Sequence, residues 1–168
     1  MKRELLIGAG ENRKKKVRFS EIGGEFENVT TLDVFGSSDV KHDLDVLPYP
    51  FEDNTFDEIH AYEVLEHCGR QGDWKFFFAQ FTEFHRILKP YGYFCGTVPM
   101  WDSPWAWGDP GHTRVITKDA IGFLSQEMYK QCGETACSDY RGVYKVDFKM
   151  IGVNESQHQL AFVIQAIK

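Results

Sequence analysis

The sequence predicts an α/β protein of three layers, whose sheet is mostly parallel and carries one antiparallel strand near its edge. Three observations predict this fold: short apolar runs typical of buried parallel strands, an amphipathic helix between two of them, and two alternating segments joined by a tight turn near the C-terminus. The chain has 168 residues without a repeat or a long linker, which predicts one domain over residues 1–168.

The strands expected in the first hundred residues are short and rich in apolar and β-branched side chains. The first, Leu5–Ile7, stops at Gly8-Ala9-Gly10, and the others are expected at Val29–Phe35, Val40–Leu44, Phe56–Tyr62 and Tyr93–Val98. Such continuous apolar runs indicate strands that are covered on both faces.

Two helices are predicted after the fourth of these strands. The first begins after the N-cap Asp73 and stops before Lys89-Pro90, and its apolar residues recur three and four apart: Trp74, Phe77, Phe78, Phe81, Phe84 and Leu88. The second is expected from the cap Thr117 to near Gly133.

The C-terminal part of the chain predicts a hairpin. Val143–Val153 and Gln159–Ile167 alternate imperfectly, and the turn Asn154–Gln157 joins them. Strands connected this tightly are expected to pair antiparallel.

Composition excludes several classes of protein. Hydrophobic residues make up 42% of the chain, too many for a disordered protein, and no apolar stretch approaches the roughly 20 residues of a membrane-spanning helix. The apolar stretch at the N-terminus is too short for a signal peptide, so a cytoplasmic location is expected. The net charge of −6 argues against stable nucleic-acid binding.

Two further patterns in the composition bear on function. The basic run Arg13–Arg18 is expected to be a solvated loop, with a patch that attracts an anionic substrate as the alternative. The four cysteines form no paired motif, so they are expected to be reduced thiols, and no metal site is predicted.

Residues at the ends of successive strands indicate a nucleoside-binding crevice. Gly8 and Gly10 follow the first strand, where glycine lets the backbone turn sharply and approach a ligand. Asp33 ends the second strand, where a carboxylate can accept both hydroxyls of a ribose, and Asp43 ends the third, where it could accept from an adenine amine. Each aspartate alone is also compatible with an ordinary turn or cap.

A longer set of residues resembles a known family. The segment Leu47–Ile59, followed by Glu63-Val64-Leu65-Glu66-His67 and by Arg86–Pro90 with a glycine before the next strand, resembles the class I S-adenosylmethionine-dependent methyltransferases. The resemblance covers about Leu5–Pro99. It implies a Rossmann-like sheet of seven strands with the last strand antiparallel, and a small, single-domain methyltransferase.

The resemblance also implies the cofactor and its binding residues. The cofactor would be S-adenosylmethionine and the product S-adenosylhomocysteine. Gly8 and Gly10 would cradle the methionine part, Asp33 would bind the ribose, Asp43 the adenine, and Glu63 would lie beside the sulfonium and amino acid moiety.

Several residues depart from the family pattern. Leu6 stands where the family has an acidic residue, and Asn12 replaces a third glycine, which Asn can imitate by tolerating a positive φ. The following segment lacks a persuasive helix, so the first helix of the fold is expected to be stunted. Tyr91 in Lys89-Pro90-Tyr91-Gly92 would be costly in a type II turn, so a different turn is expected.

The acceptor side is expected in the Trp-rich segment Pro99–Arg114, which Pro and Gly punctuate as a loop. Trp105, Trp107 and Arg114 are candidate acceptor-binding residues, and His112 is the candidate catalytic base. The alternative is a self-packed cover with hydrogen-bonded turns. Residues 139–141 are a further candidate from a neighbouring loop.

The nature of the acceptor stays open, as does the oligomeric state. Motifs of enzymes that methylate DNA are absent, which leaves a small molecule or an exposed group on a macromolecule. Two other functions compete with methyl transfer: a non-catalytic binding protein with the methyltransferase fold, and a nicotinamide-dependent dehydrogenase, which would share only the glycine turn and the ribose carboxylate.

Overall fold

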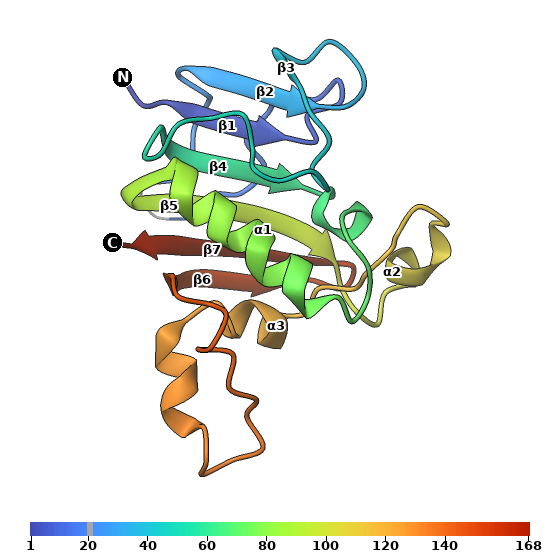
Figure 1. Cartoon of the computed structure of the whole chain (residues 1–168). Helices are drawn as coiled ribbons and strands as arrows, with labels where there is room; N and C mark the ends of the chain where they lie inside the picture. Colours follow the sequence, from blue (N-terminus) through green and yellow to red (C-terminus); the bar gives the residue numbers. More distant parts are fainter. Residues whose placement is uncertain (20–21) are drawn as a thin grey trace.

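The computed structural model describes residues 1–19 and 22–168 and shows a seven-stranded sheet in the order β3-β2-β1-β4-β5-β7-β6 (Figure 1). The strands are β1 (Glu4–Ile7), β2 (Val29–Asp33), β3 (Val40–Lys41), β4 (Phe56–Tyr62), β5 (Leu88–Pro99), β6 (Asp147–Glu155) and β7 (Gln159–Ile167). Neighbouring strands from β3 to β5 are parallel, and β7 pairs antiparallel with both β5 and β6. The predicted mostly parallel sheet with one antiparallel strand is confirmed.

The carboxyl ends of the parallel strands all meet at one edge of the sheet, on the right in Figure 1. The short helices η1 (Leu65–His67) and α2 (Pro104–Gly108) follow β4 and β5 at this edge. In open parallel sheets this edge is where ligands bind.

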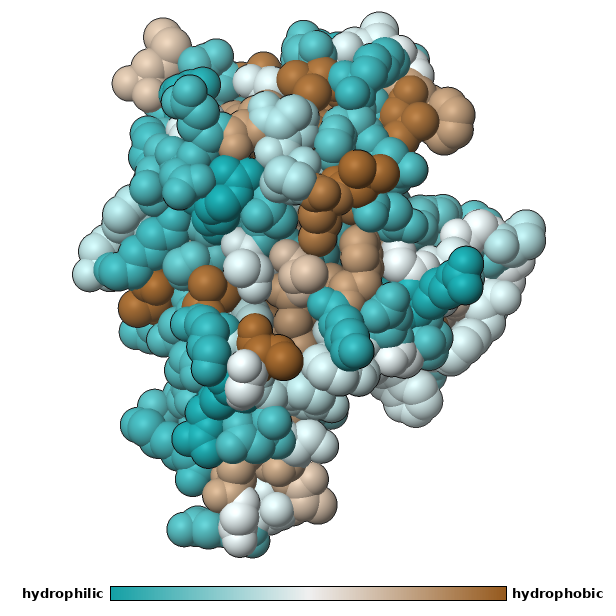
Figure 2. All heavy atoms as spheres, viewed as in Figure 1, coloured by the Kyte–Doolittle hydropathy of each residue, from teal (hydrophilic) through white to brown (hydrophobic). Residues whose placement is uncertain are grey.

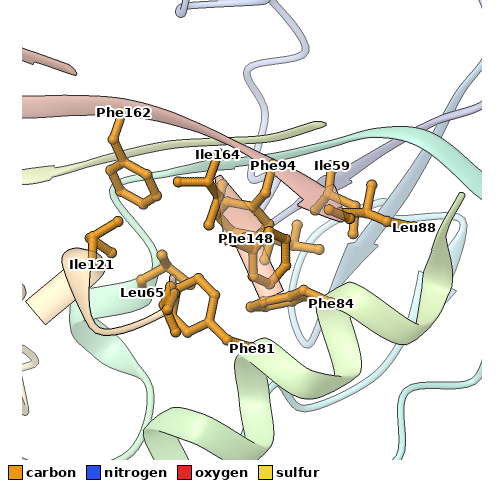
Figure 3. Packing of buried hydrophobic residues seen from close by; sticks show 14 of the residues in the cluster. Ile59, Leu65, Phe81, Phe84, Leu88, Phe94, Ile121, Phe148, Phe162 and Ile164 are labelled. Carbon is orange, nitrogen blue, oxygen red and sulfur yellow. The ribbon is translucent and has the colours of Figure 1, made fainter. Parts of the chain in front are cut away.

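Helix α1 (Trp74–Ile87) covers one face of the sheet (Figure 1), with the predicted cap: the Asp73 side chain accepts a hydrogen bond from the Phe76 N–H at 3.0 Å. Phe81 and Phe84 are fully buried and point from the helix towards the sheet residue Phe94 (Figure 3). Burying a side chain of this size contributes about 1.5–3 kcal/mol, so these phenylalanines are a main attachment of α1 to the sheet.

The second predicted helix is broken. α3 (Lys118–Gly122) starts after the predicted cap Thr117, but the chain leaves the helix and resumes as the 3-10 helix η2 (Gln126–Gln131). The Leu124 carbonyl accepts the Phe148 N–H at 3.0 Å and the Tyr144 hydroxyl at 3.0 Å. Because these long-range bonds use the carbonyl that a continuous helix would need, the expectation of one helix to Gly133 is wrong.

Two expectations about strand ends also need correction. β5 begins directly after α1, at Leu88, and Tyr91 within it adopts a φ of 61°. A turn without a positive φ at Tyr91 was expected, because this region of φ disfavours residues with a Cβ, but Tyr91 adopts it. β6 begins at Asp147 instead of Val143.

The described residues between β1 and β2 cover the opposite face of the sheet and form no helix there. This agrees with the expectation that the first helix of the fold is stunted. Val17 and Ile22 are buried there against Leu6 and Val163. Phe19 lies over Gly152 of β6, where a Cβ would come within 2.3 Å of its ring. This layer is therefore an irregular segment that reaches across the sheet.

A buried ion cluster attaches the irregular segment to the sheet. Glu4 of β1 and Glu58 of β4 are register neighbours with fully buried side chains, and the Lys15 ammonium pairs with both carboxylates, with Glu58 at 2.8 Å. His60 contacts Glu58 at 3.0 Å. Lys2, which lies at the protein surface, also pairs with Glu58, with 2.8 Å between its ammonium and a carboxylate oxygen. The basic run is therefore solvated only in part: Arg13–Arg18 was expected to be a solvated loop, but Lys15 within it is buried.

The pKa values in this cluster follow from the ion pairs. Burial alone would raise the pKa of Glu58, but hydrogen bonds from His60, Lys15 and Lys2 outweigh burial and lower it. Burial alone would lower the pKa of Lys15, but its hydrogen bonds to Glu4 and Glu58 leave that pKa raised. The charged forms of both partners are thus held at neutral pH.

The cysteines are free thiols in the structure, and Cys68 and Cys95 are buried. The sulfur atoms of Cys132 and Cys137 lie 3.6 Å apart near η2. Within the described residues, no helix combines the length and the apolar character needed to cross a bilayer.

The ion cluster yields the first testable prediction. Replacing Lys15 by Met removes the buried cation that the Glu4 and Glu58 carboxylates share, which should lower the free energy of unfolding by about 3–5 kcal/mol. Urea denaturation followed by circular dichroism measures this change. Adding Glu58→Gln to Lys15→Met should recover part of the loss.

Lys14→Met is the matched control, because Lys14 is exposed and makes no side-chain ion pair among the described residues. It should change the unfolding free energy by less than about 0.5 kcal/mol. A Lys15→Met variant as stable as this control would show that the buried cation does not hold the layer in place.

Candidate functional site

The glycine loop after β1 has the predicted backbone conformation. Gly8 has a φ of 60°, and a Cβ there would lie 2.3 Å from the Val64 side chain, so only glycine permits the close packing. Gly10 has a φ of 49°, and no atom lies within 4 Å of where its Cβ would be. The loop is therefore packed against Val64 at Gly8 and open at Gly10.

Asp33 meets this loop from the end of β2. Its carboxylate accepts the Gly10 N–H at 3.0 Å and the Phe35 N–H at 2.9 Å. A carboxylate has about four acceptor positions, so each oxygen retains one for a ligand hydroxyl. The structure thus brings together Gly10 and Asp33, as the sequence predicted.

Asn12 and Leu6 do not restore the missing family residues. Asn12 does not adopt a positive φ; its side chain instead accepts the Lys14 N–H at 3.1 Å, as in an Asx turn. Leu6 is buried under the irregular segment. The loop keeps its shape through Gly8, Gly10 and Asp33.

Asp43 lies two residues beyond β3, because that strand ends at Lys41 instead of Leu44. Asp43 is exposed, and its carboxylate accepts the Asp45 N–H at 2.9 Å. Asp45, which sequence reasoning missed, accepts the Gly69 N–H at 2.8 Å and ties this turn to the segment after β4. Asp43 as the adenine ligand remains a prediction.

Glu63 follows β4 with a φ of 53°, a conformation that costs a residue with a Cβ about 1–2 kcal/mol. Its backbone N–H donates to the Thr97 carbonyl at 2.9 Å, and its carboxylate accepts from the Gln159 side chain at 2.8 Å. Neighbouring strands therefore hold Glu63 in this unfavourable geometry, at the carboxyl edge.

The loop after α2 folds back onto η1. The Glu66 carbonyl accepts the backbone N–H groups of Thr113 at 2.9 Å and Arg114 at 3.3 Å. As a result, the His112 ring lies 4.6 Å from the His67 ring between centroids, and its Nε2 lies 4.0 Å from a Glu66 carboxylate oxygen. The candidate base His112 thus shares its surroundings with two side chains from η1.

Glu66 is the most perturbed carboxyl group at this edge. It is 2% exposed, and burial raises its pKa to about 8, with the neighbouring Glu63 charge adding to the shift. No described residue hydrogen-bonds to either of its carboxylate oxygens.

Arg114 is buried, which differs from the open acceptor contact that the sequence suggested. Its guanidinium donates to the Leu65 carbonyl at 2.8 Å and to the Gln80 side chain at 2.5 Å, and it lies over the Phe76 ring. Burial lowers the pKa of Arg114. These contacts give Arg114 a positioning role for η1 and α1, and acceptor binding by it remains a prediction.

The Trp-rich segment contains a short helix where a loop was expected. Ser103 caps α2 and Pro104 begins it, which is a favourable start for a helix. Trp105 is 65% exposed and Trp107 is 69% exposed, and the Trp107 indole N–H donates to the Trp101 carbonyl at 2.9 Å. The lobe with α2 protrudes at the carboxyl edge (Figures 1 and 2). We call the exposed side chains of Trp101, Trp105 and Trp107 the Trp rim.

A separate aromatic cavity of about 370 Å³ lies at the start of α1. Its wall includes Trp74, Phe77, Phe123 and Tyr140, and Arg114 also reaches it. Trp74 belongs to the apolar residues whose spacing predicts an amphipathic helix, but it is 39% exposed and packs on Tyr140. Trp74 is the first residue of α1, so its side chain lies beyond the part of the helix that packs on the sheet, which explains its exposure.

Comparison with known proteins supports the family. Residues 19–96 match a family model described as a methyltransferase domain. The chain is similar to the solved structure of a SAM-dependent methyltransferase from Archaeoglobus fulgidus, with 16% identity, a TM-score of 0.57, and coverage of 98% of this chain and 86% of that chain. No curated protein sequence matches it.

Two other similar solved structures are an N-methyltransferase and a cyclase. N-methyltransferase NodS from Bradyrhizobium japonicum WM9, in complex with S-adenosyl-L-homocysteine, has 14% identity, a TM-score of 0.58, and coverage of 99% of this chain and 79% of that chain. The 4+2 cyclase SpnF has 12% identity, a TM-score of 0.56, and coverage of 99% and 75%, respectively.

A mostly parallel sheet with an antiparallel β7 and a glycine loop at its carboxyl edge is a Rossmann-like α/β architecture. Residues 19–96 match the methyltransferase-domain model, and the fold of the chain is that of solved S-adenosylmethionine-dependent methyltransferases. The open side of Gly10 and the free acceptor positions of Asp33 fit the cofactor of that family.

The Asp33 geometry yields the second prediction. Asp33→Ala should weaken binding of S-adenosylhomocysteine at least tenfold, because it removes charge-assisted hydrogen bonds to the ribose and the anchor of the Gly10 N–H. Isothermal titration calorimetry measures the dissociation constant.

Glu52→Ala is the control, since Glu52 is an exposed carboxylate that precedes β4 at the other edge of the sheet. It should bind as the unmodified protein does. An unchanged dissociation constant for Asp33→Ala would refute the ribose role.

Proposed function

We propose that this chain transfers a methyl group from S-adenosylmethionine to an acceptor that approaches over the Trp rim. The observation that carries the proposal is the open glycine loop with Gly10 bound to Asp33, at the carboxyl edge where the strands of the sheet end. The bound cofactor supplies an electrophilic methyl group on its sulfonium, so the protein need only bind, orient and exclude water.

The residues proposed for the cofactor have distinct tasks. Gly8 and Gly10 cradle the methionine moiety, with the open space beside Gly10, Asp33 accepts from the ribose, and Asp43 accepts from the adenine amine. Glu63, held by Gln159, offers a carboxylate beside the amino acid moiety. Carboxylates bind hydroxyl and ammonium groups through charge-assisted hydrogen bonds, which matches this cofactor.

The acceptor side rests on the exposure of the Trp rim. Large apolar side chains gathered on a protruding lobe are typical of interaction sites, because indoles bury much area at low entropic cost. Trp105 and Trp107 would contact the acceptor, and His112, between the rim and η1, would lie close to its reactive group.

A non-catalytic binding protein is the second candidate. It is favoured by Leu6 in place of an acidic residue and by the absence of a helix in the described part of the segment after the glycine loop. SpnF, a cyclase, illustrates that similar folds occur in proteins of other activities.

Methyl transfer is tested with S-adenosylmethionine carrying a labelled methyl group and acceptor pools of small amines, alcohols, thiols and carboxylic acids, alongside peptide and RNA pools. We expect acceptor-dependent formation of S-adenosylhomocysteine and a labelled product, both detected by mass spectrometry. Asp33→Ala should lose the activity, and Glu52→Ala should retain it.

Two outcomes would contradict the proposal. Absence of calorimetric binding by both the cofactor and its product would exclude a cofactor-dependent activity. Binding without a methylated product in any pool would favour the non-catalytic candidate.

The Trp rim yields a further prediction. A Trp105→Ala/Trp107→Ala variant should raise the KM for the acceptor about tenfold, the equivalent of losing roughly 1.4 kcal/mol of contact, while the affinity for S-adenosylhomocysteine stays unchanged. Steady-state kinetics and calorimetry separate the two effects.

Trp74→Ala is the matched variant for the aromatic cavity, and it should leave the acceptor KM unchanged. If Trp74→Ala raises that KM and the rim variant does not, the acceptor enters the cavity instead. Urea denaturation of both variants identifies losses that come from stability alone.

A further inference from the structure

Three side chains that can ligate a metal converge at the carboxyl edge. Glu66 and His67 come from η1, and His112 comes from the loop after α2. One ligand atom from each lies within 4.8 Å of those of the other two. We call these residues the Glu-His-His cluster.

Three polar atoms of this cluster have no hydrogen-bond partner in the described part of the chain. Both carboxylate oxygens of Glu66 and Nδ1 of His112 are buried without a hydrogen bond from any described residue. A buried carboxylate without a partner costs several kcal/mol unless something compensates it. The neighbouring Arg114 guanidinium instead donates to Leu65 and Gln80.

A backbone carbonyl orients the His67 ring. Its Nδ1 lies 3.1 Å from the Gly111 carbonyl, which can only accept, so Nδ1 is the donor in this contact and Nε2 is the nitrogen left for a metal. Histidines that bind metals are commonly oriented in this way, by donating their other N–H to a backbone carbonyl. A Cβ on Gly111 would come within 3.3 Å of Nδ1, so glycine permits the close approach.

Further carboxylates surround the cluster. An oxygen of Asp109 lies 3.8 Å from Nε2 of His112, and Glu63 adds negative charge beside Glu66. The negative charge of these carboxylates attracts a cation, while the buried Arg114 guanidinium, which also acts on Glu66, opposes that attraction.

We propose that the Glu-His-His cluster binds a divalent ion of the first transition series, such as Zn²⁺ or Mn²⁺. Two imidazoles and one carboxylate form the ligand set of many zinc sites that leave a coordination position open. Mg²⁺ prefers an all-oxygen set and is disfavoured here. His112, predicted as a catalytic base, is then a metal ligand, and the site is one that the sequence analysis did not predict.

Metal binding is measured on untagged protein freed of ions by a chelator and dialysed, without cofactor or acceptor. Titration calorimetry should show one equivalent of Zn²⁺ or Mn²⁺ bound per chain. An excess of about one hundred times the dissociation constant should raise the melting temperature by roughly 5–10 °C. Mg²⁺ should give a much smaller shift.

Variants locate the ion. His67→Ala and His112→Ala should each weaken binding at least tenfold, and His67 is exposed, so its variant should remain folded. His158→Ala is the matched control, since His158 is an exposed histidine outside the cluster, and it should bind as the unmodified chain does. A Cys132→Ser/Cys137→Ser variant should also retain binding, which excludes capture of zinc by the two thiols.

Three results would overturn the proposal: no heat and no melting shift with either ion, equal affinity in the cluster variants and the His158 control, or loss of binding with the two cysteines. Because neither cofactor nor acceptor is present, these outcomes are independent of methyl transfer.

Discussion

The Lys15 ammonium between Glu4 and Glu58 is the contact on which the rest of the architecture depends. A parallel sheet must be covered on both faces, and in the described residues one face has only an irregular segment for cover. Such a segment cannot satisfy its backbone groups internally as a helix does. Glu4 compensates in part, because its carboxylate also accepts the Glu27 N–H at 2.7 Å.

The same contact supports the candidate site indirectly. Glu4 and Glu58 belong to β1 and β4, the central neighbours whose carboxyl ends carry the glycine loop and the η1 segment. Gly8 packs against Val64, so the two loops are in direct contact. Fixing the two strands to each other and to their cover thus fixes the distance between the proposed cofactor residues and the Glu-His-His cluster.

Local patterns predicted the elements that local physics determines. The bounds of β4 and β7 and the cap and length of α1 follow from apolar periodicity and a capping side chain. The break after α3 arises from Phe148, more than twenty residues away, and the burial of Lys15 depends on Glu58. For the site, Gly10 and Asp33 follow adjacent strands and were predictable as a pair. Glu66 and His112 meet only because a loop folds back, which spacing does not reveal.

The exposure of the tryptophans has an optical consequence. All four indoles of the chain lie outside the buried core: three form the Trp rim, and Trp74 lines the aromatic cavity. Intrinsic tryptophan fluorescence therefore reports on the surroundings of the carboxyl edge and the start of α1, and hardly on the packing of the sheet. The protein thus carries its own fluorescent probes where ligands are expected to arrive, and their emission is already that of partly hydrated indole before anything binds.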